Sequence, residues 1–553
     1  MNFIFMILIT LKLSHAENIL MITMAGTKSH KIPFWELANG LIKRGHHITF
    51  ISGFTADFHM VGLKEMTPKS LVNYIKNFTD WDLVGARLDN KAPIPAWKAL
   101  RYPAESCNSL LEPDAETGVA VTDELLTQRF HLAIVDGAFP ECALGIVHRL
   151  SLPFMFINTV GFYTGSLAIA GNPIAYAVTP HVFTALTQTM HLWQRVENYV
   201  THILADLLHK YYTNQVHDVL IAHFGSSLPH PFTIARNVSF ILQNGHAIVT
   251  NPRPFYPNVA EIACMHCRPA VKLSHELEQF VETAPAGVIF FSMGSSVKPA
   301  NMPEKFRKLL LKVFARLSQY HILWKWDEHS STKRLTMKST TILSMRNTTT
   351  STQIMNDIPK NVYLSGWLPQ QDILGQRKLK AFITHGGLLS MYEAIYHGVP
   401  MVMLPVFCDH DVNAAKAEQD GYAIRLSLEI ITADKLYHAI LAIINNDKYK
   451  REINKKRQLL LDQMNTPLDT AVFWTEYVLR HQDITHLLSP IRNMSFFIYR
   501  SLDVILCLLL LVVGIFIILK KILHYAFATT AKTQRVPERL QMKLIKQFLC
   551  INC

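Results

Sequence analysis

The residues best suited to chemistry gather between positions 367 and 413. Within this stretch the apolar run Lys380–Thr384 predicts a buried parallel strand, and a helical pattern covers Leu388–His397. The turn between them consists of His385, Gly386 and Gly387. Two glycines at a strand-to-helix turn leave backbone N–H groups free for an anion, and the helix dipole favours negative charge there. The pattern therefore predicts a diphosphate site at the ligand edge of an open α/β sheet.

Four side chains around this turn can bind the rest of a nucleotide-like ligand. Trp367 offers a flat face for a base, and Gln370 offers an amide to a base or ribose edge. Glu393 lies about two turns into the helix and can accept hydrogen bonds from ribose hydroxyls. Asp409 follows the predicted strand Met401–Leu404 and can accept from sugar hydroxyls. Each residue alone has an ordinary structural explanation, but their order along the chain favours a binding site.

The ordered set closely resembles the donor-binding signature of the UDP-glycosyltransferases, the membrane-bound family that includes the UDP-glucuronosyltransferases. The matching segments are W-L-P-Q (367–370), F-I-T-H-G-G (382–387), Y-E-A-I-Y-H-G-V-P (392–400) and Asp409 with Asn413. The resemblance covers nearly the whole chain, and details of the second half are similar to insect members. It implies an enzyme that uses a UDP-sugar.

The resemblance implies a role for each position of the signature. It implies that Trp367 stacks on uracil, that Gln370 contacts the nucleoside and that Glu393 holds the ribose. The positions that it assigns to the diphosphate or the sugar end are Ser295, His385, Gly386, Gly387, Asp409, His410 and Asn413. One position departs from the family, because His410 stands where the family has glutamine. Sugar preference and rate are open at this position.

A histidine and an aspartate in the first half form a second candidate group. His30 lies in the loop after the predicted strand Asn18–Met24, and Asp136 follows the predicted strand His131–Val135. Either residue alone is commonly a surface or capping group, but both fall on the ligand edge of a doubly wound sheet. A carboxylate bonded to one imidazole nitrogen fixes the tautomer and stabilises the imidazolium. The resemblance implies that His30 is a general base and that Asp136 orients it.

The order of predicted elements indicates an α/β fold with Rossmann-like units in both halves of the chain, followed by a C-terminal transmembrane helix. The resemblance implies that the two Rossmann-like domains face each other in the glycosyltransferase B fold. At 553 residues the chain is long enough for two or three domains. The expected parts are a signal peptide (1–16), an N-terminal acceptor-binding domain (17–265), a linker (266–286), a C-terminal UDP-sugar-binding domain (287–485), a transmembrane helix (502–519) and a basic cytosolic tail (520–553). The resemblance further implies that the predicted helix Leu468–His481 packs back across the first domain.

Apolar segments near both ends predict a membrane-anchored protein. Residues 3–11 are apolar and precede S-H-A, as in a signal peptide, and residues 504–519 form an unbroken apolar run. The formal charge is +12, and residues 520–553 supply half of it, with seven Lys or Arg against one Glu. A basic segment beside a span predicts a single-pass type I protein with lumenal catalytic domains, and no nucleic acid partner.

Other sequence features bear on compartment and stability. Sequons at Asn77, Asn237, Asn347 and Asn493 indicate a glycoprotein, and the family implies the endoplasmic reticulum. Eight cysteines are too few for a disulfide scaffold. Cys264-Met-His-Cys267 has thioredoxin-like or metal-ligand spacing, but no second pair accompanies it, so a structural role is favoured. The Ser/Thr/Lys-rich residues 328–357 predict a surface loop.

These features predict inverting transfer of a hexosyl group from UDP-glucose or UDP-glucuronate to a hydroxyl of small lipophilic acceptors, as in conjugation and detoxification. The resemblance to insect members favours glucose, and an apolar acceptor pocket is expected within residues 160–245. Neither a metal nor a cofactor beyond the UDP-sugar co-substrate is expected. Two alternatives stay open: an inactive membrane-held binder of UDP-sugars or lipophiles, and a UDP-sugar epimerase. The oligomeric state, a homo-oligomer included, is also open.

Overall fold

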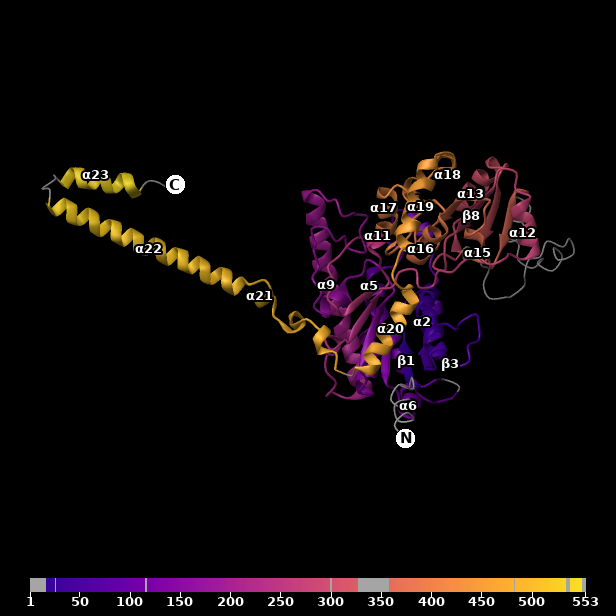
Figure 1. The fold of residues 1–553 in the computed structure, drawn as a ribbon, viewed down its shortest axis with the longest axis horizontal. Coiled ribbons are helices and arrows are strands. Elements are labelled where there is room, and N and C mark those ends of the chain that lie inside the picture. Colours follow the sequence, from indigo (N-terminus) through magenta and orange to yellow (C-terminus); the bar gives the residue numbers. More distant parts are fainter. Residues whose placement is uncertain are drawn as a thin grey trace, which may run out of the picture. The chain divides into compact units, whose positions relative to one another are not determined.

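The computed structural model describes residues 16–24, 26–114, 117–298, 301–326, 358–481, 483–533 and 538–549. The expected signal peptide, apart from its last residue, and the whole stretch 328–357 lie outside the described residues. The chain forms two compact units, Met1–Ser489 and Pro490–Cys553. Within the first unit, the first half of the chain (indigo to magenta) and the second half (pink to orange) form two neighbouring α/β lobes (Figure 1).

The first lobe is built on a seven-stranded parallel sheet with the order β3-β2-β1-β4-β5-β6-β7. Its strands are β1 (Asn18–Ile22), β2 (His47–Ile51), β3 (Leu63–Met66), β4 (Leu132–Asp136), β5 (Phe154–Asn158), β6 (Phe240–Gln243) and β7 (Val259–Glu261). Alternate residues of β1 enter different cores: Leu20 and Ile22 lie in one apolar cluster, and Ile19 and Met21 in another. Because both faces of the sheet are buried at its centre, the strands β1, β4 and β5 are almost entirely apolar.

Helices cover both faces of this sheet. The helices of the first lobe are α2 (Ile32–Lys43), α3 (Lys69–Phe78), α4 (Leu83–Leu88), α5 (Ala96–Leu111), α6 (Val121–Leu126), α7 (Glu141–Arg149), α8 (Gly165–Ile169), α9 (Leu192–Phe224), α10 (Pro231–Ala235) and α11 (Ala247–Thr250), with the short 3-10 helix η1 (Lys28–Lys31). The sequence does not place the elements between residues 53 and 130. The structure shows that helices α3 and α5 there bury Leu71, Ile75 and Leu110 in the core.

The second lobe contains a six-stranded parallel sheet with the order β10-β9-β8-β11-β12-β13. Its strands are β8 (Val288–Ser292), β9 (His321–Lys325), β10 (Val362–Ser365), β11 (Leu379–Thr384), β12 (Met401–Met403) and β13 (Ala423–Arg425). Its helices are α12 (His275–Glu282), α13 (Glu304–Arg316), α15 (Gln370–Leu374), α16 (Leu388–His397), α17 (His410–Gln419), α18 (Ala433–Asn445) and α19 (Asp447–Leu461). The two parallel sheets confirm the predicted pair of Rossmann-like domains.

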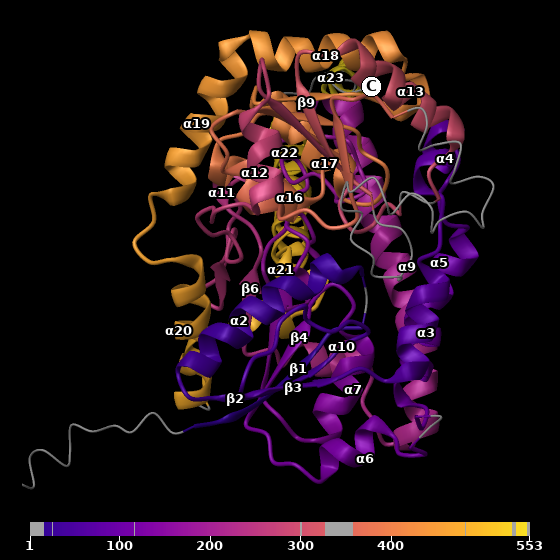
Figure 2. The same ribbon diagram turned by 90° about the vertical axis from the view of Figure 1, so that its right-hand side faces the viewer.

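Helix α20 (Pro467–Arg480) returns to the first lobe, as the resemblance implies. It begins at Thr466, whose side chain accepts a hydrogen bond from the Asp469 N–H, and it lies beside α2 (Figure 2). The Trp474 ring stacks on Phe240 of β6 with a centroid distance of 4.4 Å. The Arg44 Nε atom donates to Glu476 at 2.8 Å. The chain therefore crosses between the lobes twice, which ties them together.

Two disulfides form among the described residues, although the sequence predicts no disulfide scaffold. Cys107 of α5 pairs with Cys142 of α7, and Cys264 pairs with Cys267. The first bridge joins elements 35 residues apart in the sequence, so only their packing reveals it. The second closes the motif that metal-ligand spacing also allowed, and it supports the structural role.

The second unit consists of α21 (Phe496–Tyr499), α22 (Leu502–Thr533) and α23 (Glu538–Leu549). Within the described part of the chain, α22 is the one helix long and apolar enough to cross a membrane, over Leu502–Thr530. The helix continues beyond Leu519, where the predicted span ends. The helix does not end at Lys520 and Lys521, because lysine is a good helix former. A single such helix fits the predicted anchor.

Candidate functional site

His30 and Asp136 lie on the same edge of the first sheet because their strands are adjacent and parallel. η1 follows β1, and Asp136 is the last residue of β4, which pairs with β1. The His30 Nδ1 atom lies 4.0 Å from Asp136 Oδ2, and 26% of the His30 side chain is exposed. The structure thus brings the predicted pair together, but without the direct hydrogen bond that the sequence led us to expect.

Thr159 lies between the two residues. Its hydroxyl oxygen is 2.8 Å from His30 Nδ1 and donates to Asp136 Oδ1 at 3.4 Å. Because the hydroxyl has one proton and gives it to the carboxylate, the oxygen accepts from a protonated Nδ1. His30 Nε2 is then the unprotonated nitrogen. No motif in the sequence singles out Thr159, but it directly follows β5 and so lies on the ligand edge of the sheet.

Asp136 is held by several donors deep in the first lobe. Its carboxylate accepts from the Thr23 hydroxyl at 3.1 Å and from the Ala138 N–H at 3.0 Å. Lys31, fully buried, donates to Thr23 Oγ1 at 3.1 Å. Burial raises the pKa of Asp136, while the Lys31 ammonium and these hydrogen bonds act against that rise. Burial also lowers the pKa of Lys31 to about 8, and the charge of Asp136 acts against this.

These neighbours decide the protonation state of His30. Burial, with the Lys31 ammonium beside it, lowers the pKa of His30 to about 4, and the carboxylate of Asp409 acts in the opposite direction. The imidazole is therefore neutral near pH 7. A neutral imidazole with a free Nε2 can accept a proton, which is the requirement for a general base. Asp409 belongs to the second lobe, so its charge acts on His30 across the two lobes.

In the second lobe, His385 directly follows β11, and its ring packs against Gly294 and Gly387. A Cβ on Gly294 would lie 2.3 Å from the His385 ring, and one on Gly387 would lie 2.6 Å from it. Glycine at both positions is what lets the ring sit against the backbone. Burial lowers the pKa of His385 well below its usual value, and the charges of His410 and Lys325 lower it further to a smaller extent. His385 is therefore a neutral N–H donor and not a cation toward an anionic ligand.

The glycine turn is fastened to the next helix. Gly387 is the residue before α16, and Gly386 has a φ of 89°. Asn413 of α17 donates from its side-chain amide to the Gly386 carbonyl at 2.9 Å and to Asp409 Oδ2 at 2.8 Å. One side chain therefore links the predicted diphosphate turn to the predicted sugar-binding carboxylate. The arrangement sets these two groups at a fixed separation.

His410, the departure from the family pattern, is buried. Its ring centroid is 4.5 Å from that of His385, and its Nδ1 accepts from the Phe407 N–H at 3.3 Å. Burial lowers the pKa of His410 to about 3, with smaller effects of Arg87 and His30. The ring is neutral, and since Nδ1 accepts, Nε2 carries the proton. Position 410 thus offers a single N–H donor.

The remaining donor-side residues form a second group along α16. Gln370 donates to Glu393 Oε2 at 2.6 Å and to the Ser390 hydroxyl at 3.0 Å. Trp367, just before Gln370, keeps 70% of its surface exposed and so presents a free face. Ser295, on the loop after β8, donates to Thr27 Oγ1 of the first lobe at 3.3 Å. The structure therefore places the predicted donor residues on the edge that faces His30.

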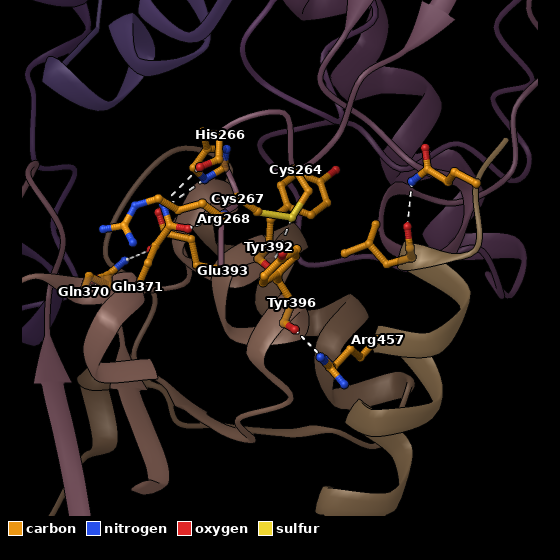
Figure 3. Close-up of a disulfide and its surroundings, with 12 residues drawn as sticks. Cys264, His266, Cys267, Arg268, Gln370, Gln371, Tyr392, Glu393, Tyr396 and Arg457 are labelled. Carbon is orange, nitrogen blue, oxygen red and sulfur yellow. Dashed lines mark hydrogen bonds and ion pairs between the residues drawn. A yellow bond between two sulfur atoms is a disulfide. The ribbon is translucent and has the colours of Figure 1, made fainter. Parts of the chain in front are cut away.

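The sequence analysis did not assign His266 to this group. Its Nε2 atom lies 3.3 Å from Glu393 Oε1, on the side of the carboxylate opposite to Gln370 (Figure 3). The local signal was its position inside Cys264-Met-His-Cys267, which pointed only to the cysteines.

Aromatic rings form a wall near the end of β1. The ring centroid of Phe78 on α3 lies 4.3 Å from that of Tyr102 on α5, and the ring centroid of Tyr102 lies 6.4 Å from that of Phe139. The ring of Phe139 is 6.2 Å from that of Tyr212 on α9. Tyr102 donates to the Met24 carbonyl at 3.2 Å, and its pKa is raised by burial and by the charge of Asp136. This aromatic wall (Phe78, Tyr102, Phe139, Tyr212) includes α3 and α5, which lie outside the predicted acceptor segment.

Known proteins share this chain's sequence pattern. The family described as "UDP-glucoronosyl and UDP-glucosyl transferase" matches residues 18–536. UDP-glucuronosyltransferase 2A3 of Mus musculus is 35% identical over 410 residues, which cover 72% of this chain and 70% of that protein. UDP-glycosyltransferase UGT4 of Dactylopius coccus is 27% identical over 92% of this chain and 94% of that protein.

Solved structures share the fold. A complex between a UDP-glucosyltransferase from Polygonum tinctorium, capable of glucosylating indoxyl, and 3,4-dichloroaniline matches 84% of this chain and 99% of its own, with a TM-score of 0.54 and 13% identity. The glycotransferase of kitacinnamycin matches with a TM-score of 0.51 and 15% identity. At these identities the likeness shows the fold alone, and it confirms the glycosyltransferase B arrangement.

Proposed function

This chain belongs to the family of UDP-glucuronosyl and UDP-glucosyl transferases, so it is an enzyme that transfers a sugar from a UDP-sugar, and we propose that it moves glucose to a hydroxyl of small lipophilic acceptors. The observation that carries the proposal is the electrostatic effect of Asp409 on His30. A neutral histidine of one lobe lies within the field of a carboxylate of the other. The proposed base for the acceptor and the proposed ligand of the sugar are therefore close enough for their charges to interact.

The proposed reaction is a single displacement. His30 Nε2 removes the proton from the acceptor hydroxyl while the acceptor oxygen attacks the anomeric carbon from the face opposite UDP. The C–O bond to the diphosphate breaks, UDP leaves with the bonding electrons, and the anomeric centre inverts. The proton on His30 is stabilised through Thr159 by the buried carboxylate of Asp136.

The donor side supports UDP as the leaving group. The N–H groups of the glycine turn lie at the N-terminus of α16, where a diphosphate is favoured. His385 adds a neutral donor, and Ser295 a hydroxyl. Trp367 presents its exposed face to uracil, and Glu393 with Gln370 presents oxygen and nitrogen atoms to the ribose. These groups together account for each part of UDP.

The charge around the sugar end supports glucose over glucuronate. Arg87 is a cation whose charge reaches His410. It is already paired with Asp411 at 2.8 Å and with Glu429 at 2.6 Å. A sugar carboxylate needs a free basic partner, whereas a neutral hexose does not. The aromatic wall supports flat, apolar acceptors because such surfaces pack well against rings.

The proposed location is the membrane of the endoplasmic reticulum, with the catalytic lobes in the lumen. Helix α22 supports a single span. Asn77, Asn237 and Asn493 are exposed, as acceptors of N-linked sugars must be, while Asn347 lies outside the described residues. The two disulfides also fit an oxidising compartment.

The proposed function is tested by measuring glycosyl transfer by membranes that contain the full chain. Radiolabelled UDP-glucose and UDP-glucuronate are offered separately with a panel of phenols and alcohols. We expect conjugates from UDP-glucose and none from His30→Ala membranes, which should still bind UDP. Conjugates from UDP-glucuronate alone would reverse the proposed sugar. UDP binding without any conjugate would favour the inactive binder, and His410→Gln would then be the first variant to test.

A further inference from the structure

The loop Cys264–Cys267 contacts the donor side of the second lobe (Figure 3). Its disulfide closes four residues, and the Cys267 N–H donates to the Cys264 carbonyl at 2.9 Å within the turn. Cys264 has a φ of 65°, a left-handed conformation that a cysteine adopts only when its surroundings hold it. The disulfide supplies such a hold. The turn directs His266 into the protein, where 5% of its surface remains exposed.

The loop is fastened to the two helices that present Gln370 and Glu393. The Gln371 side chain of α15 donates to the His266 carbonyl at 3.1 Å and accepts from the Arg268 N–H at 2.8 Å. Arg268 also binds Asp372 through two nitrogens, at 2.5 and 3.0 Å. The Cys264 sulfur lies 3.7 Å from the carbonyl oxygen of Tyr392, the residue before Glu393. The loop therefore cannot move without disturbing the nucleoside end of the site.

His266 reaches the carboxylate of Glu393 with an unused nitrogen. Its Nε2 lies 3.3 Å from Glu393 Oε1, but the contact lacks hydrogen-bond geometry, and within the described residues Nε2 has no other partner. On the other oxygen of Glu393, Gln370 donates at 2.6 Å. A buried polar atom without a partner is costly, and sites that bind polar ligands commonly contain one. The unused nitrogen is aimed at the carboxylate assigned to the ribose.

We propose that His266 is a further donor-site residue, which together with Glu393 binds the ribose hydroxyls of the UDP-sugar, and that the Cys264–Cys267 disulfide holds it there. This inference rests on the proposed function of the donor site. A ribose hydroxyl that donates its proton to Glu393 Oε1 can at the same time accept a hydrogen bond from the Nε2–H group of His266. The ligand thus gives His266 Nε2 the hydrogen-bond partner that it lacks.

The test measures binding of UDP and of 2′,3′-dideoxy-UDP to the full chain in detergent by calorimetry. We expect His266→Ala to lower the affinity for UDP about tenfold, as for loss of a hydrogen bond to a partly charged group. The affinity for dideoxy-UDP should stay unchanged. His438→Ala, an exposed histidine on α18, is the matched control and should change neither. His266→Gln, which keeps an N–H donor, should recover part of the affinity for UDP.

The outcomes separate the two levels of the proposal. Failure of the unaltered protein to bind UDP would overturn the proposed function itself. UDP binding that is equal in the unaltered protein and in His266→Ala would overturn the role of His266 alone. Equal weakening of UDP and dideoxy-UDP would also overturn it, because a general structural defect would not distinguish the ribose hydroxyls. In turnover, we expect the KM for the UDP-sugar to rise while kcat stays close to its original value.

The double variant Cys264→Ser with Cys267→Ser tests the disulfide. We expect the serine variant to lower the affinity for UDP, as His266→Ala does. A protein that carries both the serine changes and His266→Ala should bind UDP no more weakly than either variant alone. Retained binding of dideoxy-UDP shows that the lobe is folded. Unchanged UDP affinity in the serine variant would overturn the positioning role of the disulfide.

Discussion

The His30 Nδ1 atom lies 2.8 Å from the hydroxyl oxygen of Thr159, while it is 4.0 Å from Asp136 Oδ2. The orienting contact of the proposed base is therefore made by a hydroxyl, and the carboxylate acts through it. A hydroxyl that accepts from the ring and donates to the carboxylate fixes the tautomer as a direct contact would. It also makes the threonine a testable part of the arrangement.

Thr159→Val removes the hydroxyl and keeps the shape of the side chain. We expect kcat to fall about 10- to 100-fold, because Nδ1 loses its partner and the ring its orientation. Thr159→Ser, which keeps the hydroxyl, should retain most of the activity. Initial rates with the preferred UDP-sugar and calorimetric UDP binding check both variants. A valine variant with full kcat would show that Thr159 does not position His30.

The acid limb of kcat/KM should reflect His30. Its pKa of about 4 lies below the ordinary 6.5. The folded protein therefore disfavours the protonated ring, and both activity and this contribution to stability are present above pH 6.5 and are lost as the pH falls toward 4. We expect rates to hold to a lower pH than an unperturbed histidine would allow. A pH profile between 4 and 8 measures this.

Lys31→Met should move that limb to higher pH. The buried ammonium lowers the pKa of His30, so its removal raises that pKa. Asp136 also loses the cation that opposes the rise of its own pKa, which acts in the same direction on the profile. A variant whose acid limb stays in place or moves to lower pH would contradict the role of Lys31. Melting temperature serves as the control for folding.

Gly294→Ala tests the close approach of His385. The new Cβ would lie 2.3 Å from the His385 ring, and the φ of 71° adds strain of about 1–2 kcal/mol. We expect loss of stability and weaker UDP binding. Gly118→Ala is the matched control, since its φ is 66° with no neighbour within 4 Å. Gly118→Ala should have the same backbone strain but bind UDP normally. If Gly294→Ala and Gly118→Ala bind UDP equally well, His385 is not a ligand of UDP.

Trp474→Ala tests the return of α20 to the first lobe. Loss of a ring stacked at 4.4 Å on Phe240 should cost about 3 kcal/mol of unfolding free energy. The neighbouring Phe473→Ala removes a ring that is 50% exposed and should cost much less. Thermal unfolding of the two variants compares them. Similar melting temperatures would show that the contact contributes little.

The sequence by itself determined the local elements and the donor signature. The predicted helix Leu388–His397 has the bounds of α16, and the predicted strand Lys380–Thr384 ends at the same residue as β11. Apolar runs and turn glycines act over a few residues, so they can be recognised without knowing the fold. The pairing of two such domains and the return of α20 came from the family resemblance, and the structure confirms both.

Only the tertiary structure decided the contacts between distant parts of the chain. Thr159 comes to His30 across 129 residues, and His266 comes to Glu393 by the packing of a linker against α16. The Cys107–Cys142 bridge and the aromatic wall likewise depend on helices whose position no local pattern sets. Local propensity fixes which residues form a strand or helix. Which side chains then meet depends on the burial of both faces of each sheet, and that is a property of the whole fold.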